Sequence, residues 1–181
     1  MTNDFTAELA KLHELKGAEF SRQVERIALR KEFHPLETDK DIYTVGGEKS
    51  DDYQNLLQAA RKAVEFGYKV YILPNPIKTR TPDFIFEKKG VYRVYDLKTV
   101  FGKGSVGTNL LDSIGQCNSI LINMQSVYST RSLGIDLKNY FEANPRAIEV
   151  MIFKGRKRLV ISRYLASKNT FLRLFKKLYE G

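Results

Sequence analysis

Two spacings of apolar residues divide this sequence into helical and extended segments. Apolar side chains recur every three or four positions, as in amphipathic helices, over residues 2–30, 50–66, 109–116, 131–144 and 168–179. Short runs rich in β-branched and aromatic residues predict strands over residues 42–45, 68–73, 84–86, 91–97, 119–124, 148–153 and 159–161. Because helices and strands are interspersed, the sequence predicts an α/β fold.

Residues 81–99 contain the most informative pattern, two strands joined by a turn cluster at residues 87–90 that ends in a glycine. In an antiparallel hairpin the start of the first strand lies beside the end of the second. Asp83 and Asp96 are therefore expected to converge. Alternate residues of a strand share a face, so Lys98 is expected to project with Asp96.

Two carboxylates and a lysine in this arrangement suit a hydrolytic site. They can hold a hard divalent cation such as Mg²⁺ or Mn²⁺ and orient an attacking water. The lysine can position or deprotonate that water, or offset charge on a phosphate. The alternative interpretation is a surface hairpin with ordinary charges.

Pro82-Asp83 followed by Asp96-Leu97-Lys98 resembles the motif of the PD-(D/E)xK nuclease superfamily. The predicted order αβββαβ over about residues 45–125 is similar to the core of that family. The resemblance implies a restriction-endonuclease-like α/β domain over residues 34–181, which ends in a β-hairpin and a helix. Residues 1–33 are then a helical N-terminal extension or linker. Within the superfamily the chain is similar to toxin nucleases of contact-dependent growth inhibition and of phage-associated polymorphic toxins.

The resemblance also assigns roles to individual residues. Asp83 and Asp96 would be metal ligands, helped by Glu48 near the start of the first core helix, while Lys98 would act on the water or the phosphate. Gln116 is expected on the second core helix, facing the site. Three other acidic residues compete with Glu48 for its role: Asp51, Asp52 and Glu65.

The formal net charge is +9, and residues 151–181 carry nine basic residues against one acidic residue. Such a basic end suits a polyanionic partner. A hairpin tip with four cations is expected to bind phosphates of nucleic acid: Lys154, Arg156, Lys157 and Arg158. The glycine-containing loop after the motif is expected to add phosphate contacts from Thr99, Lys103 and Ser105. The alternative is a charged turn that protects a sheet edge.

Several classes of protein are disfavoured by the sequence. Cys117 is the single cysteine, so an internal disulfide framework is excluded. His13 and His34 lack partners at ligand spacing, which argues against a zinc site. No run of 18 apolar residues and no signal-peptide pattern occurs. The expected location is the cytoplasm, reached directly or by delivery within a larger secreted or phage-associated protein.

Together these features predict a metal-dependent endonuclease that hydrolyses phosphodiester bonds in DNA or tRNA. An immunity or carrier protein is a further expected partner, and a membrane is not. The principal alternative is a catalytically silent module of the same fold that binds nucleic acid or docks a protein. A structural protein of a phage or mobile element, with no affinity for nucleic acid, is a third hypothesis.

Overall fold

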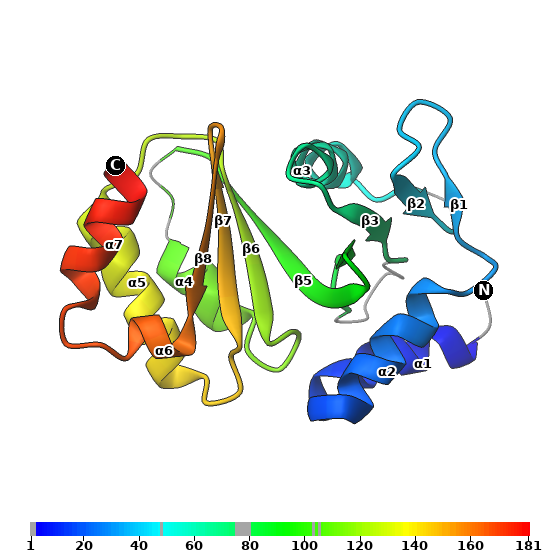
Figure 1. The fold of residues 1–181 in the computed structure, drawn as a ribbon, viewed down its shortest axis with the longest axis horizontal. Helices are drawn as coiled ribbons and strands as arrows, with labels where there is room; N and C mark the ends of the chain where they lie inside the picture. Colours follow the sequence, from blue (N-terminus) through cyan, green and yellow to red (C-terminus); the bar gives the residue numbers. More distant parts are fainter. Residues whose placement is uncertain (1–2, 48, 75–80, 103, 105) are drawn as a thin grey trace. The chain divides into compact units, whose positions relative to one another are not determined.

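The computed structural model describes residues 3–47, 49–74, 81–102, 104 and 106–181 (Figure 1). The chain forms two compact units, residues 1–97 and residues 98–181. The boundary between them lies between Leu97 and Lys98, within residues 81–99, and not at residue 33. Both units combine helices with strands, so the protein is a mixed α/β protein. Within the described residues, no helix is both long enough and apolar enough to cross a membrane.

The first unit is built on a mixed sheet. Its strands are β1 (His34–Pro35), β2 (Ile42–Thr44), β3 (Lys69–Ile72), β4 (Phe84–Lys88) and β5 (Val91–Val100). β2 and β3 are parallel, whereas the pairs β1–β2, β3–β4 and β4–β5 are antiparallel. The last residues of β5, from Lys98 onward, belong to the second unit.

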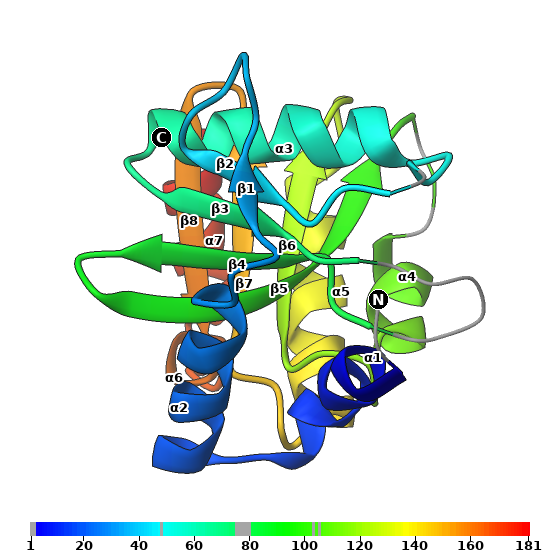
Figure 2. The same cartoon turned by 90° about the vertical axis from the view of Figure 1, so that its right-hand side faces the viewer.

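Helices cover both faces of this sheet. They are α1 (Asn3–Lys11), the 3₁₀ turn η1 (Leu12–Glu14), α2 (Gly17–Ala28) and α3 (Tyr53–Glu65). Figures 1 and 2 show α3 on one side of the strands and α1 and α2 on the other. Phe33 connects the N-terminal helices to the sheet, because its ring lies 6.3 Å from that of Phe5 and 5.4 Å from that of Tyr71, edge to face in both cases.

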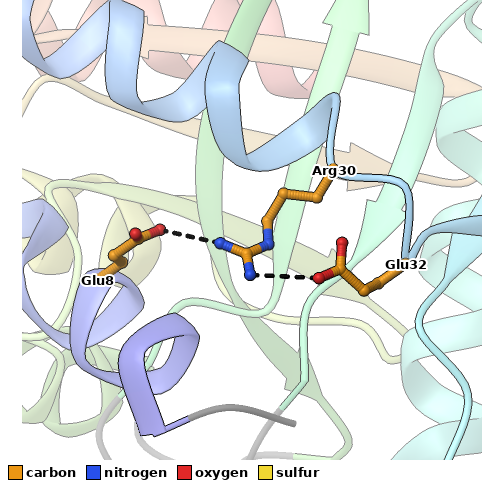
Figure 3. Close-up of polar contacts among 3 residues, drawn as sticks. All are labelled: Glu8, Arg30 and Glu32. Carbon is orange, nitrogen blue, oxygen red and sulfur yellow. Dashed lines mark hydrogen bonds and ion pairs between the residues drawn. The ribbon is translucent and has the colours of Figure 1, made fainter.

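Arg30 fastens α1 to the segment that follows α2 (Figure 3). Its guanidinium pairs with Glu8 at 3.4 Å and with Glu32 at 3.2 Å, and lies 4.2 Å above the centre of the Phe5 ring. Phe5 and Leu9 are each 1 % exposed. The predicted N-terminal extension is therefore packed within the first unit and contributes to its core.

The predicted hairpin is confirmed, with a tighter turn than the one expected over residues 87–90. β4 and β5 are joined by Lys89 and Gly90 alone, at φ 53° and 79°. Two successive positive φ values define a type I′ turn, whose twist matches that of the flanking strands. The Gly90 N–H also donates to Glu87 Oε1 at 2.7 Å, which stabilises the turn.

The second unit has helices on one face of three strands (Figure 1). Its elements are α4 (Val106–Asp112), β6 (Ser119–Met124), α5 (Thr130–Ala143), β7 (Glu149–Lys154), β8 (Lys157–Ser162), α6 (Arg163–Ala166) and α7 (Phe171–Glu180). β6 and β7 are parallel, and β7 and β8 are antiparallel. Apolar residues of α4, α5 and α7 form one core with Ile120, Ile122, Val150 and Ile152.

Two expectations about helix boundaries were wrong. The helix predicted from residue 50 begins at Tyr53, and Asp52 at its cap position makes no side-chain capping bond. The helix predicted over residues 109–116 is α4, which ends at Asp112. Gln116 therefore lies in the turn before β6 and not on a helix. The short elements β1 and α6 had no counterpart among the predictions.

Candidate functional site

The predicted catalytic residues of the first unit gather at one level of its sheet. Pairing between strands aligns Thr44 with Ile72, Ile72 with Phe84, and Phe84 with Tyr95. β2 and β3 end at this row, and β4 begins there. Asp83 and Asp96 are the next residues beyond the row on β4 and β5, which agrees with the expected convergence.

Asp83 is fixed by three hydrogen bonds. Its N–H donates to the Tyr95 carbonyl at 3.0 Å, and its carbonyl accepts from the Leu73 N–H at 2.9 Å. Its side-chain Oδ2 accepts from the Leu97 N–H at 2.7 Å. Because that N–H belongs to the peptide joining Asp96 to Leu97, the Asp83 carboxylate lies against the backbone of the second predicted ligand.

Asp96 is 2 % exposed, whereas Asp83 and Lys98 are half-buried. Tyr95 shares a face of the sheet with Ile72 and Phe84, so Asp96 projects from the opposite face. Lys98 has the same parity as Asp96 on β5. The strand therefore presents a buried carboxylate and an ammonium two residues apart on one face.

The row of residues next to Asp96 on its face of the sheet is apolar and aromatic. Tyr43, Tyr71, Ile85 and Val94 form the preceding row on that face, and the rings of Tyr43 and Tyr71 stack at 4.9 Å. Burial, with the nearby acidic groups Tyr92, Tyr43 and Glu87, raises the pKa of Tyr71 to about 12. Tyr71 is therefore uncharged at physiological pH.

A cavity of about 170 Å³ opens at the same edge, where β2 and β3 end and α3 begins. Its polar lining comes from Thr44, the Gly46-Gly47 backbone, Lys49, Ser50 and Tyr53. Sequence reasoning did not identify this cavity. The sequence signal that could have indicated the cavity is the glycine pair Gly46-Gly47 followed by Lys49-Ser50, between β2 and α3.

Candidates for a third metal ligand are less well defined than the aspartate pair. Glu48 lies outside the described residues, although its neighbours Gly47 and Lys49 line the cavity. Asp51 and Asp52 are exposed just before α3, and Glu65 is exposed at its far end. Among the residues that the structure describes, no group of three or more His, Cys, Asp or Glu side chains could hold a metal ion.

The predicted cationic tip is divided by the strand geometry. Lys154 pairs with Lys157, and Phe153 pairs with Arg158, so Arg158 projects from the sheet face opposite to Lys154 and Lys157. Arg156 lies in the two-residue turn. Of the other predicted phosphate-binding residues, Lys103 and Ser105 lie outside the described residues.

Lys154 has a structural partner. Its Nζ donates to the Tyr179 carbonyl at 2.7 Å and lies 3.8 Å from the centre of the Tyr179 ring. Lys154 thus connects the β7–β8 hairpin to the last turn of α7, where a cation also interacts favourably with the helix dipole.

Comparison with known proteins gives few relatives. No protein-family model and no curated protein matches the sequence. Among solved structures, the chain is similar to a chain of the CdiA-CT/CdiI toxin and immunity complex from Burkholderia pseudomallei. The two chains share 16 % identity and a TM-score of 0.49, over 67 % of this chain and 98 % of the other.

Proposed function

We propose that the protein is a metal-dependent phosphodiesterase that cleaves nucleic acid, with Asp83 and Asp96 as metal ligands. One observation carries the proposal. The Asp83 carboxylate accepts the Leu97 N–H at 2.7 Å and so lies beside the peptide of the buried Asp96. This contact supports an arrangement in which the carboxylates of neighbouring strands share one cation at the edge where β3 ends and β4 begins.

The chemistry of this pair fits a hard cation. Mg²⁺ is commonly held by one or two carboxylates while water and phosphate oxygens complete its coordination. Glu48 is proposed as a third ligand. The proposal is also supported by the sequence of elements from α3 to β6, which is helix, three strands, helix, strand, the order that the resemblance to PD-(D/E)xK nucleases implies.

The residues have distinct proposed roles. A bound Mg²⁺ or Mn²⁺ supplies Lewis-acid polarisation of a phosphoryl oxygen and a water of lowered pKa. Asp83 and Asp96 hold and orient the cation, and the Leu97 N–H fixes the direction of the Asp83 carboxylate. Lys98 orients the attacking water or neutralises charge on the phosphate. A role for Gln116 beside this group stays a prediction from the resemblance.

DNA or tRNA remains the proposed substrate, and an immunity or carrier protein the proposed protein partner. The alternative is a module that keeps the fold without the chemistry. Metal binding and hydrolysis separate the two proposals.

Calorimetric titration with Mn²⁺ is expected to show binding that Asp83→Asn removes. Asparagine keeps an oxygen that can accept the Leu97 N–H, so the hairpin should stay intact while the anionic ligand is lost. Glu19→Gln on exposed α2 removes the same charge elsewhere in the first unit and should leave the heat unchanged. Absence of heat from the wild-type protein, or equal heat from Asp83→Asn, would contradict the metal site.

A further inference from the structure

The positive charge of the protein resides in its second unit. Residues 1–97 contain 16 basic and 16 acidic residues, whereas residues 98–181 contain 14 basic and 5 acidic residues, a net charge of +9. The unit that carries the aspartate pair is therefore neutral overall. Any attraction for a polyanion at long range must arise mainly from the second unit.

Part of this charge is concentrated where the β7–β8 hairpin meets the end of α7. Lys157 projects from the same face of the hairpin as Lys154, because the two residues are paired. Lys154 is in turn bonded to Tyr179. Lys176 lies on α7 three residues before Tyr179 and therefore on the same side of the helix, whereas Lys177 lies on the opposite side. Together with Arg156 in the turn, Lys157 and Lys176 form what we call the hairpin–helix surface: Arg156, Lys157 and Lys176.

The hairpin–helix surface is accessible and contains little opposing charge. Arg156 and Lys176 are exposed, and Lys157 is half-buried. Glu180 is the acidic residue nearest along the chain, and its Oε1 accepts a hydrogen bond from Thr130 at 2.9 Å. The Lys154 contacts hold the hairpin and the helix together, so the cations are presented by a rigid support.

The composition of this surface favours a nucleic-acid backbone over other anionic partners. Lysines are depleted at protein–protein interfaces, whose centres are apolar and aromatic. A basic amphipathic helix can instead lie on a membrane through its apolar face, but the apolar residues Phe171, Phe175 and Tyr179 of α7 are buried in the core. Clustered lysine and arginine are typical of phosphate contacts.

We propose that the hairpin–helix surface binds the phosphodiester backbone of nucleic acid without reading its sequence. The binding is independent of hydrolysis and of metal, because none of its residues belongs to the aspartate pair. Lys154 acts as a positioning residue that joins the hairpin to the helix, and Arg158 on the opposite strand face is not part of the surface.

Fluorescence anisotropy in EDTA tests this proposal with the full chain, a labelled 20-base-pair DNA duplex and a 20-nucleotide single-stranded RNA over a series of salt concentrations. Replacing Lys157 and Lys176 by Ser is expected to raise the Kd about tenfold or more at moderate salt. It should flatten the slope of log K against log salt by about 1.8 for DNA and about 1.4 for RNA. Two DNA sequences of equal length should give equal changes, since phosphate contacts carry no sequence information.

The matched control removes two cations from the other end of the unit, with Arg146→Ser before β7 and Lys168→Ser before α7; both residues are exposed. Its salt slope should remain that of the wild type. A second variant, Arg156→Glu with Lys176→Glu, should weaken binding further if the fold, measured by thermal unfolding, is retained. Equal slopes for the Lys157/Lys176 variant and the wild type, or equal losses in the control, would overturn the proposal.

The outcomes also separate related possibilities. Tighter binding of polyglutamate of equal charge than of either nucleic acid would assign the surface to acidic proteins and overturn the proposal. Unequal responses of the DNA and RNA arms, each with a flattened slope, would support it and identify the preferred polymer. The assay contains no metal, so a failure of the proposed hydrolysis would leave these results unchanged.

Discussion

Asp96→Asn is expected to reduce cleavage of nucleic acid at least about a hundredfold while the protein stays folded. Asp96 is 2 % exposed, and asparagine has nearly the same volume, so the packing around it should be preserved. Loss of a ligand to a catalytic metal removes several kcal/mol of charge stabilisation, and about 1.4 kcal/mol corresponds to a tenfold change in rate. Initial rates with Mg²⁺ and thermal unfolding provide the two readouts.

Two further variants make this prediction specific. Lys98→Ala should also lose cleavage but keep Mn²⁺ binding, because the ammonium is proposed to act on water or phosphate and not on the metal. Glu19→Gln should cleave like the wild type. If Asp96→Asn cleaves at the wild-type rate, the assignment of this strand as catalytic is wrong.

Arg163→Ala is expected to destabilise the second unit by about 2–4 kcal/mol. Hydrogen bonds to charged groups are worth roughly 1.5–3 kcal/mol each, and water that hydrates the exposed carbonyls partly offsets their loss. The Arg163 guanidinium donates to the carbonyls of Phe141 and Ala147, at 3.0 Å each, and to that of Asn144. These carbonyls belong to the end of α5 and to the turn that follows it. The last carbonyls of a helix have no hydrogen-bond partner within the helix. The guanidinium also lies 5.5 Å from the centre of the Phe141 ring.

Thermal unfolding should show this loss as a decrease in Tm of roughly 5–15 °C for a chain of this size. Arg163→Lys keeps the positive charge near the end of α5 but lacks the planar fork of donors, so its Tm should lie between those of Arg163→Ala and the wild type. Arg131→Ala, an exposed cation at the start of α5, controls for loss of charge. A Tm for Arg163→Ala equal to that of the wild type would show that the three carbonyls are satisfied in another way.

The elements predicted best from the sequence were those whose signals are local. Four of the six residues over 119–124 are apolar, and β6 has these bounds. The hairpin of β4 and β5 follows from a short turn that contains Gly90 between β-branched and aromatic runs. Asp83 and Asp96 approach each other because this register is set by the turn, so this part of the candidate site was predictable from two strands alone.

Features that depend on tertiary contacts were not predictable in the same way. The spacing of Phe5 and Leu9 indicates a helix but not which surface covers it. Both residues are buried within the first unit, so the boundary between the units differs from residue 33. The run of charged residues from Lys154 to Arg158 indicates a single cationic tip and gives no sign that Lys154 has a partner elsewhere. Its contact with Tyr179, 25 residues later, gives it a different partner from Arg156 or Arg158.

The candidate site shows the same division. The sequence placed two carboxylates and a lysine on one hairpin, because strand alternation and hairpin pairing operate over a few residues. The cavity lined by Lys49, Ser50 and Tyr53 forms only when the end of β3 meets the start of α3. Such a meeting of distant segments leaves only a weak signal in a single sequence.

Incubation of the purified wild-type protein with plasmid DNA and with total tRNA, in Mg²⁺, in Mn²⁺ and in EDTA, tests the proposed hydrolysis most directly. Asp96→Asn, purified in parallel, controls for contaminating nucleases. The proposal predicts cleavage of at least one substrate by the wild type with Mg²⁺ or Mn²⁺, and none in EDTA or by Asp96→Asn. Intact substrates under all conditions, or cleavage that persists equally in EDTA, would contradict it.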